Sequence, residues 1–294
     1  MDHPDTADFR DSETGAAPKS LADHGMLHVR LRQIFDFLLA QRQYNAVTQH
    51  MSYVQNLRPW PDTGAKLRSL LFATAHTQTQ PKLNELVHVW KGLEEQKAVF
   101  AAVTTLDQLV AAVQLLEKPA EQEAPPPKTR TSKQPQPEPI LSPLNALWTS
   151  LNKAPGFGPK TAALFVKAIV DIHTQDINTA LRFLDPFPID PAERLRVPVD
   201  AVIRYIFQCL TGKNCNFEKI NRLIVESGLH SEAYPTIWDD LWFWGFITQH
   251  GGGDKRKLAP NDAKFWSILG APKDQWAQIA ATAEDFIALV SPAA

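Results

Sequence analysis

The spacing of the apolar residues constrains the fold more than any other feature, because they recur at steps of three and four along most of the chain. This spacing places them on one face of a helix, and the strict alternation typical of strands is scarce. We find no internal repeat. We therefore predict a mainly α fold. The predicted helices are 27–39, 66–75, 82–97, 106–116, 144–151, 160–172, 199–210, 217–227, 237–250, 262–269 and 273–289.

Two segments lack this spacing and divide the chain. Residues 1–24 are rich in small and polar side chains and are predicted to be a disordered tail. Residues 119–143 are dense in proline, glutamine and charge, which disfavours helix and predicts a linker or long surface loop. The expected organisation is thus an N-terminal helical region over 25–118 and a second helical region over 144–294.

Composition excludes several classes of protein. The chain of 294 residues has a net charge of −2, so any contact with nucleic acid must come from a local arrangement of donors. No apolar run approaches the roughly 20 residues that span a bilayer, and the N-terminus does not resemble a secretory signal, so we expect a cytoplasmic protein with no membrane partner. Cys209 and Cys215 are interpreted as structural, and neither a metal site nor a cofactor is predicted.

One short run carries the most specific signal. The helix at 144–151 is expected to end before Pro155, with a tight turn at Gly156 and Gly158 and a second helix whose first turn contains Pro159. This is the pattern of a helix-hairpin-helix. Its glycines allow close approach of a phosphate, and the free N–H groups at the start of the next helix can donate to it. A plain turn between two packed helices is the alternative.

The hairpin run 155–162, together with Val197-Pro198-Val199-Asp200, resembles the helix-hairpin-helix/Gly-Pro-Asp superfamily of base-excision DNA glycosylases, which includes endonuclease III and 8-oxoguanine glycosylase. The resemblance implies a two-lobed helical glycosylase fold with a helix-hairpin-helix DNA-binding motif. It also implies that Lys160, directly after the hairpin, is the nucleophile and that Asp200 is the second catalytic group.

The resemblance assigns further roles by position. His76 and Gln78 correspond to a loop that wedges into DNA, and aromatic side chains are expected to line a pocket for the everted base. For each aromatic residue, packing in the core is the alternative. The predicted DNA-binding residues are Pro155, Gly156, Phe157, Gly158, Pro159, Thr161, His76 and Gln78. The predicted base-pocket residues are Trp148, Trp238 and Trp242.

The chain departs from the family pattern between the two catalytic positions. Residues 176–196 look inserted, and they bring Asp185 and Asp190 into consideration as alternatives to Asp200. Asp200 is preferred because it precedes an apolar-periodic segment, where it would act as a helix N-cap.

The sequence therefore predicts a DNA glycosylase, with strand-nicking (AP) lyase activity, that excises a damaged or modified base through a lysine Schiff base. Its expected partner is double-stranded DNA containing that base, and the expected state is a monomer. Two alternatives stay open. One is excision of hypermodified phage bases in antiviral defence rather than repair, and the other is a non-catalytic helix-hairpin-helix protein in which Lys160 only contacts phosphate.

Overall fold

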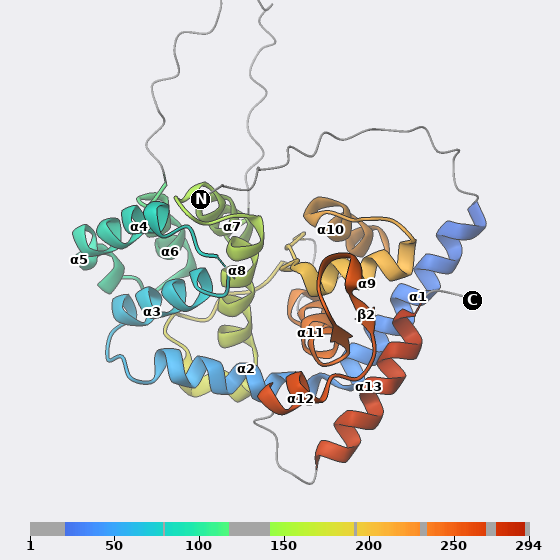
Figure 1. The fold of residues 1–294 in the computed structure, drawn as a ribbon. Coiled ribbons are helices and arrows are strands. Elements are labelled where there is room, and N and C mark those ends of the chain that lie inside the picture. Colours follow the sequence, from blue (N-terminus) through green and yellow to red (C-terminus); the bar gives the residue numbers. More distant parts are fainter. Residues whose placement is uncertain are drawn as a thin grey trace, which may run out of the picture.

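The computed structural model describes residues 21–78, 80–117, 142–190, 193–229, 234–268 and 275–291. This part of the chain is mainly helical, as predicted (Figure 1). Residues 1–20 of the predicted tail and 119–141 of the predicted linker lie outside the described residues. The first helix begins at Leu21, slightly before the predicted end of the tail.

One group of helices consists of α3 to α8, with the short 3-10 helix η1 packed against α8 (Figure 1). Neighbours along the chain also pack in space, since α6 contacts α7 and α7 contacts α8. α3, the first helix of the group, packs against both α5 and α8. The elements are α3 (Thr63–Ala75), α4 (Leu83–Glu95), α5 (Lys97–Ala101), α6 (Leu106–Gln114), α7 (Pro143–Lys153), α8 (Pro159–Thr174) and η1 (Asp176–Leu181).

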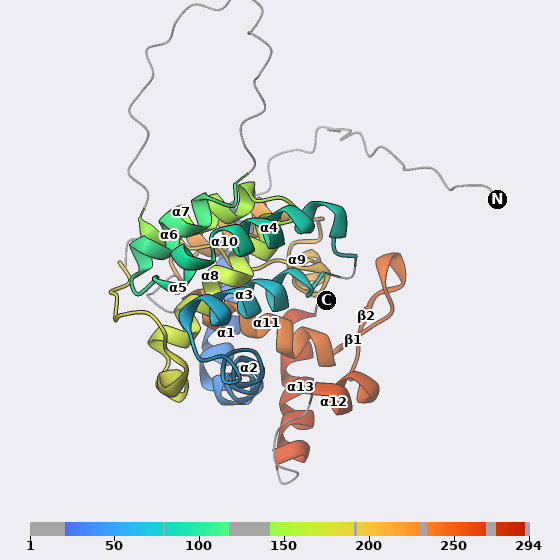
Figure 2. The same cartoon turned by 90° about the vertical axis from the view of Figure 1, so that its left-hand side faces the viewer.

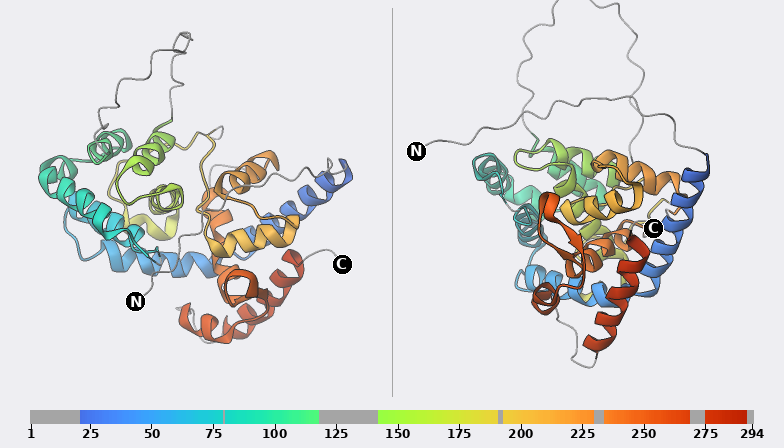
Figure 3. Two further views of the ribbon diagram at one scale, coloured as in Figure 1. Left: turned by 45° about the horizontal axis from the view of Figure 1, so that its top comes forward. Right: turned by 45° about the vertical axis from the view of Figure 1, so that its right-hand side comes forward.

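The second group combines the first helix with the C-terminal part of the chain. α1 packs against α11 and α13, and α9 contacts α10, α11 and α13 (Figure 3). The antiparallel pair β1–β2 forms a small hairpin that projects from this group (Figure 2). The elements are α1 (Leu21–Ala40), α9 (Ala201–Thr211), α10 (Phe217–Glu226), α11 (Tyr234–Ile247), β1 (Gln249–His250), η2 (Gly253–Lys255), β2 (Lys257–Leu258), α12 (Asp262–Ile268) and α13 (Trp276–Val290).

The grouping in space differs from the division expected along the sequence. α1 belongs with the C-terminal helices, whereas α7 and α8 pack with the N-terminal ones. α2 (Arg42–Leu57) joins the two groups, because it contacts α3 and η1 on one side and α1 and α11 on the other (Figure 1). α2 was not among the helices predicted from the sequence, because its composition is largely polar.

α11 is the central helix of the core. It is apolar on nearly every side, and a helix of that kind is stable in water only when it is surrounded by protein. Trp238 and Trp244 are completely buried, and their rings contact Phe35 and Phe37 of α1. Because α11 also contacts α8 and α9, it fixes the relative position of the two helices that carry the predicted catalytic residues.

None of the helices that the structure describes is both long and apolar enough to cross a membrane.

Candidate active site

A short turn joins α7 and α8 at the position where the helix-hairpin-helix was predicted. α7 ends at Lys153 and α8 begins at Pro159. Gly156 has a φ of +78°, a conformation that glycine adopts far more readily than other residues. A Cβ at this position would also lie 2.7 Å from the Leu86 side chain. Both the backbone angle and the close packing therefore require glycine here.

Two side chains from the α3–α4 region hold the turn. The carboxylate of Glu85 accepts a hydrogen bond from the N–H of Gly156 at 3.1 Å. The side-chain amide of Gln78 donates to the carbonyl oxygen of the same glycine at 3.3 Å. Both backbone groups of Gly156 are thus occupied, and the hairpin is fixed to the neighbouring helices. The sequence did not single out Glu85.

Only a narrow part of the hairpin reaches the surface. Gly158 and Lys160 are partly exposed and Pro159 is exposed. The N–H groups of Gly158 and Lys160 lie at the start of α8. Within the described residues, neither group has a hydrogen-bond acceptor. Such groups, at the positive end of a helix, are suited to an anion. The remaining predicted hairpin residues are buried, and they are Pro155, Gly156, Phe157 and Thr161.

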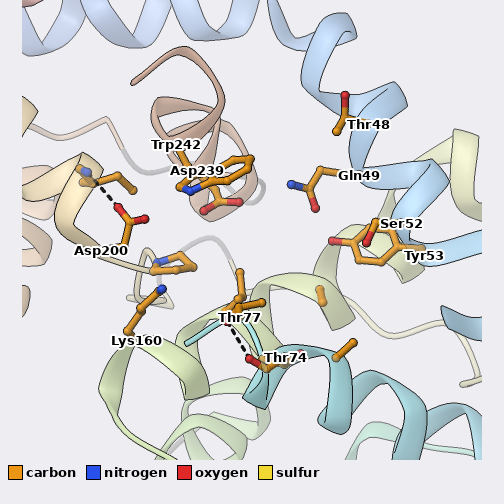
Figure 4. A pocket seen from close by; sticks show the side chains of 15 residues that line it. Thr48, Gln49, Ser52, Tyr53, Thr74, Thr77, Lys160, Asp200, Asp239 and Trp242 are labelled. Carbon is orange, nitrogen blue, oxygen red and sulfur yellow. Dashed lines mark hydrogen bonds between the residues drawn. The ribbon is translucent and has the colours of Figure 1, made fainter. Parts of the chain in front are cut away.

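A cavity of about 340 Å³ opens beside this surface. Its walls come from α2, α3, α8, α9 and α11, so it lies where the two groups of helices meet. Lys160 and Asp200 both line it (Figure 4). The volume is within the range of roughly 300–1,000 Å³ found for small-molecule sites. The two residues that the family resemblance paired are therefore brought to one cavity.

Asp200 begins α9 as predicted. One oxygen, Oδ1, accepts from the N–H groups of Val202 at 2.8 Å and Ile203 at 3.0 Å. These bonds satisfy N–H groups that lack a partner within the helix and fix the orientation of the carboxyl group. Oδ2 has no donor within the described part of the chain, and in Figure 4 the side chain lies on the same side of the cavity as Lys160. No ion pair among the described residues involves Asp200 or Lys160.

The opposite wall comes from α2, the helix that the sequence analysis missed. Gln49, Ser52 and Tyr53 line the cavity together with Thr48 (Figure 4). The side chains of Gln49 and Tyr53 point toward the cavity, and the polar residues on this face weaken the apolar periodicity by which a helix is recognised (Figure 4). The polar face of α2 is therefore the reason why neither the helix nor its cavity-lining residues were predicted from the sequence.

The three predicted base-pocket tryptophans occupy different environments. Trp242 lines the cavity. Trp238 does not, because it is buried in the core with its indole N–H donated to the Leu229 carbonyl at 3.1 Å. Trp148 also lies outside the cavity, where it donates to the Pro159 carbonyl and stacks against Phe217. Only Trp242 is placed to contact a ligand in this cavity.

The two predicted wedge residues also differ. Gln78 bonds the hairpin backbone as described above. His76 is exposed at the end of α3, where its ring stacks on Phe72 with a centroid separation of 3.9 Å. Thr77, between them, lines the cavity. The loop is therefore at the cavity's edge, with His76 as its exposed aromatic member.

The aspartates considered as alternatives to Asp200 are not near Lys160. Asp185 and Asp190 line a separate cavity of about 560 Å³ between the start of α6, the start of α7 and the 185–190 segment. Asp185 is tied to that region by its N–H, which donates to the Thr104 carbonyl at 2.7 Å. Of the three aspartates, Asp200 is the one that shares a cavity with Lys160.

A second carboxylate, which was not predicted from the sequence, lines the Lys160 cavity. Asp239, on α11, is buried, and its Oδ2 lies 2.9 Å from the Nζ of Lys167. Among the described residues no group of three or more histidine, cysteine or acidic side chains has the arrangement of a metal site.

Comparison of the chain with protein-family models, with curated proteins and with solved structures found no match.

Proposed function

We propose that this protein is a DNA glycosylase with AP lyase activity, which everts a damaged or modified base from duplex DNA and excises it through a covalent intermediate on Lys160. The observation that carries the proposal is that Lys160 and Asp200 line one cavity directly beside the hairpin turn. A nucleophile, a carboxylate and a set of backbone N–H donors at one opening are what excision of an everted nucleotide requires.

The chemistry assigned to Lys160 is nucleophilic. The neutral amine attacks C1′ of the sugar, the N-glycosidic bond breaks, and the base leaves with the bonding electron pair and takes up a proton. The nitrogen, now bonded to C1′, loses protons, and the C1′–O4′ bond breaks with O4′ taking up a proton, which leaves a C1′=N Schiff base. Removal of a proton from C2′ then expels the 3′ phosphate and breaks the strand.

The carboxylate of Asp200 is suited to the positive charge that develops on the sugar as the base departs. One of its oxygens is fixed by the start of α9, so the second is held in place without any rearrangement during the reaction. A charge that is already oriented toward the reacting centre stabilises a transition state more effectively than a mobile one.

The exposed part of the hairpin supports a grip on the DNA backbone. Gly158 and the first turn of α8 present N–H groups and a positive helix end next to Lys160. This arrangement needs no large basic surface, which agrees with the net charge of −2.

The test is reductive trapping on a duplex that contains a single preformed abasic site. Borohydride reduces a Schiff base to a stable amine, so the wild-type protein is expected to become covalently attached to the DNA. Lys160→Ala and Lys160→Arg are both expected to abolish the adduct, because neither side chain can form the imine. Lys153→Ala is the matched control, since Lys153 is an exposed lysine on the other side of the same turn and does not line the cavity.

Lys160→Arg separates catalysis from binding. It retains the positive charge, so DNA affinity should change by less than about threefold while trapping is lost. If the wild-type protein binds DNA but forms no adduct and releases no base, it is a non-catalytic DNA-binding module and the proposal is wrong.

A further inference from the structure

The β1–β2 hairpin carries positive charge that the proposed reaction does not use. Lys255 and Lys257 are exposed, and neither forms an ion pair among the described residues. Residues 254–264 contain four basic and two acidic side chains, whereas the whole chain has a net charge of −2. The β1–β2 hairpin projects from the second group of helices (Figure 2). A near-neutral protein thus presents a local excess of positive charge on one projecting element.

Gln249 fixes the base of this hairpin to the start of α9. It is completely buried, and its side-chain amide donates to the carbonyl oxygen of Val202 at 3.1 Å. The N–H of the same Val202 donates to Asp200. The amide oxygen of Gln249 accepts a hydrogen bond from the guanidinium of Arg256 at 2.8 Å. The base of the β1–β2 hairpin is therefore held beside the carboxylate that lines the cavity.

Lys264 of α12 adds a further cation at the same place. Its amine donates to the carbonyl oxygen of Gln249 at 2.8 Å and lies 5.0 Å from the centre of the Phe246 ring. Burial and the nearby Arg256 lower the pKa of Lys264, and the charge of Asp200 opposes that effect. Both cations are partly exposed. Arg256 and Lys264 therefore contribute positive charge to the surface beside Asp200.

Three glycines begin the segment that connects the two strands. Gly251 has a φ of +70°, and a Cβ there would lie 2.6 Å from the carbonyl oxygen of Lys255, so this turn requires glycine. Gly252 and Gly253 are exposed, and no described atom lies within 4 Å of a Cβ added at either position. This part of the tip has no side chain, so its backbone can approach a phosphate closely.

We propose that the β1–β2 hairpin is a second DNA-binding element, in which Lys255 and Lys257 hold phosphates of the duplex beside the opening. The α7–α8 turn belongs to one group of helices and the β1–β2 hairpin to the other, and the cavity lies where the two groups meet. Each group therefore holds the DNA backbone on its own side of the everted nucleotide. The inference rests on the proposed function for its ligand, duplex DNA, but does not depend on the chemistry of Lys160.

Two separate contacts with the backbone suit the eversion of a nucleotide. The backbone on both sides of that nucleotide has to be held in a distorted shape, against the pairing and stacking that would restore the duplex. Each phosphate contact releases counterions, so it adds affinity even where the protein as a whole is not basic. Arg256 is bonded to the buried Gln249 and positions the hairpin, whereas the exposed Lys255 and Lys257 meet the phosphates.

The experiment measures binding to a duplex that contains one tetrahydrofuran abasic analogue, which has no aldehyde and cannot form a Schiff base. Fluorescence anisotropy gives the dissociation constant over a range of salt concentrations. For Lys255→Ala/Lys257→Ala we expect at least about a 10-fold loss of affinity at physiological ionic strength. The slope of log affinity against log salt should fall by about 2, since each lost phosphate contact reduces it by about 1. Lys255→Arg/Lys257→Arg keeps both charges and should bind within about threefold of the wild type.

Lys91→Ala/Lys97→Ala is the matched control. Both are exposed lysines of the other group of helices, on α4 and α5, and neither lines the cavity. This variant removes the same total charge, and it should change the affinity by less than about twofold because local contacts, rather than net charge, determine binding. Thermal unfolding of each variant checks that it is folded.

Neutral methylphosphonate linkages locate the contacts on the DNA. Each is introduced at a single position on either side of the analogue, and binding is compared for the wild type and Lys255→Ala/Lys257→Ala. At the positions that the β1–β2 hairpin holds, neutralisation should weaken binding of the wild type by about 3- to 10-fold and of the variant by less than about twofold, because its contact is already lost. These positions should lie together on one side of the analogue.

The outcomes separate this inference from the proposed function. A wild-type protein that does not bind the duplex would overturn both. Binding without trapping on a true abasic site, together with the expected loss in Lys255→Ala/Lys257→Ala, would support the second DNA-binding element and contradict the lyase chemistry.

Three results would overturn the inference and leave the glycosylase proposal standing. The first is wild-type affinity and salt slope in Lys255→Ala/Lys257→Ala. The second is that neutral linkages weaken this variant as much as the wild type at every position. The third is an equal loss of affinity in Lys91→Ala/Lys97→Ala, which would attribute the effect to net charge.

Discussion

Lys160 and Lys167 lie about two turns apart on α8, but their surroundings are opposite. Lys160 is partly exposed at the cavity's edge and has no ion-pair partner within the described residues. Lys167 is completely buried and pairs with Asp239 and Asp171. The amine of Lys167 is held between two carboxylates and is a structural cation, whereas the amine of Lys160 has no such pairing and is the one that we propose as the nucleophile. Two lysines on one helix thus differ in burial and pairing, and the chemistry that we propose belongs to the more exposed one.

The largest expected effect is on stability and concerns the buried lysine. Lys167→Met removes one charge and leaves Asp239 without its cation, whereas Asp171 keeps its contact with Arg42, and the free energy of unfolding should fall by about 3–5 kcal/mol. Lys160→Met, the matched change at the opening, should reduce it by less than about 0.5 kcal/mol. Urea denaturation of both variants measures the difference. Similar losses in the free energy of unfolding for the two variants would show that the buried lysine is no more important for stability than the one at the opening.

The second prediction separates the capping role of Asp200 from the catalytic role that we propose for it. Asparagine is as good an N-cap as aspartate, so Asp200→Asn should leave the free energy of unfolding within about 0.5 kcal/mol of wild type. Loss of the negative charge should reduce base release by at least 100-fold, or about 2.7 kcal/mol in transition-state stabilisation. Single-turnover kinetics and denaturation, measured on the same preparation, test this. Activity near the wild-type level would make Asp200 a cap and nothing more.

The third prediction concerns the other end of α8, where His173 is buried without the partners that Lys167 has. Its ring packs against Phe183 and Phe187, and neither ring nitrogen is hydrogen bonded within the described structure. Burial, with a smaller contribution from Arg182, lowers the pKa of His173 to about 4. The unfolded chain, with a pKa of about 6.5, therefore takes up the proton first as the pH falls.

The contribution of neutral His173 to the free energy of unfolding is fully present above about pH 6.5. It decreases progressively as the pH falls toward 4. At pH 5 the loss should be about 2 kcal/mol. His173→Leu is expected to remove this part of the acid sensitivity, which denaturation at pH 7.5 and pH 5 would measure as a smaller difference than in the wild type. If the free energy of unfolding differs between pH 7.5 and pH 5 as much in His173→Leu as in the wild type, His173 is not the source of this acid sensitivity.

The smallest effect should be at the hairpin. Gly156→Ala introduces a Cβ at positive φ and 2.7 Å from Leu86, so it should destabilise the fold by about 1–2 kcal/mol. Gly158→Ala is the matched control, because its backbone is extended and no atom lies within 4 Å of the added Cβ. Thermal unfolding compares the two. Equal losses would indicate that the turn is not held by Gly156.

The parts of the site that the sequence predicted are those with local signals. The hairpin has its own glycine and proline spacing, and Asp200 stands directly before an apolar-periodic segment, so both could be located from neighbouring residues. Family resemblance, rather than any local pattern, paired Lys160 with Asp200, and the structure places both at one cavity.

The parts that could not be predicted depend on distant contacts. Lys167 and Asp239 look like ordinary charged residues in sequence, and only the packing of α8 against α11 reveals that both are buried. α2 escaped prediction because its inward face is polar where it forms the cavity wall. The mainly α class and most helices follow from local periodicity, but the assignment of α1 to the C-terminal group depends on packing.

In the proposed reaction the amine of Lys160, at the opening, forms the covalent bond to DNA, and the amine of Lys167 behind it does not. The most direct test is to reduce the protein–DNA adduct with borohydride, digest it, and identify by mass spectrometry which amine carries the sugar remnant. We expect a single modified residue, Lys160. Modification of Lys153, of Lys167 or of any other amine, or a Lys160→Ala protein that traps as well as wild type, would contradict it.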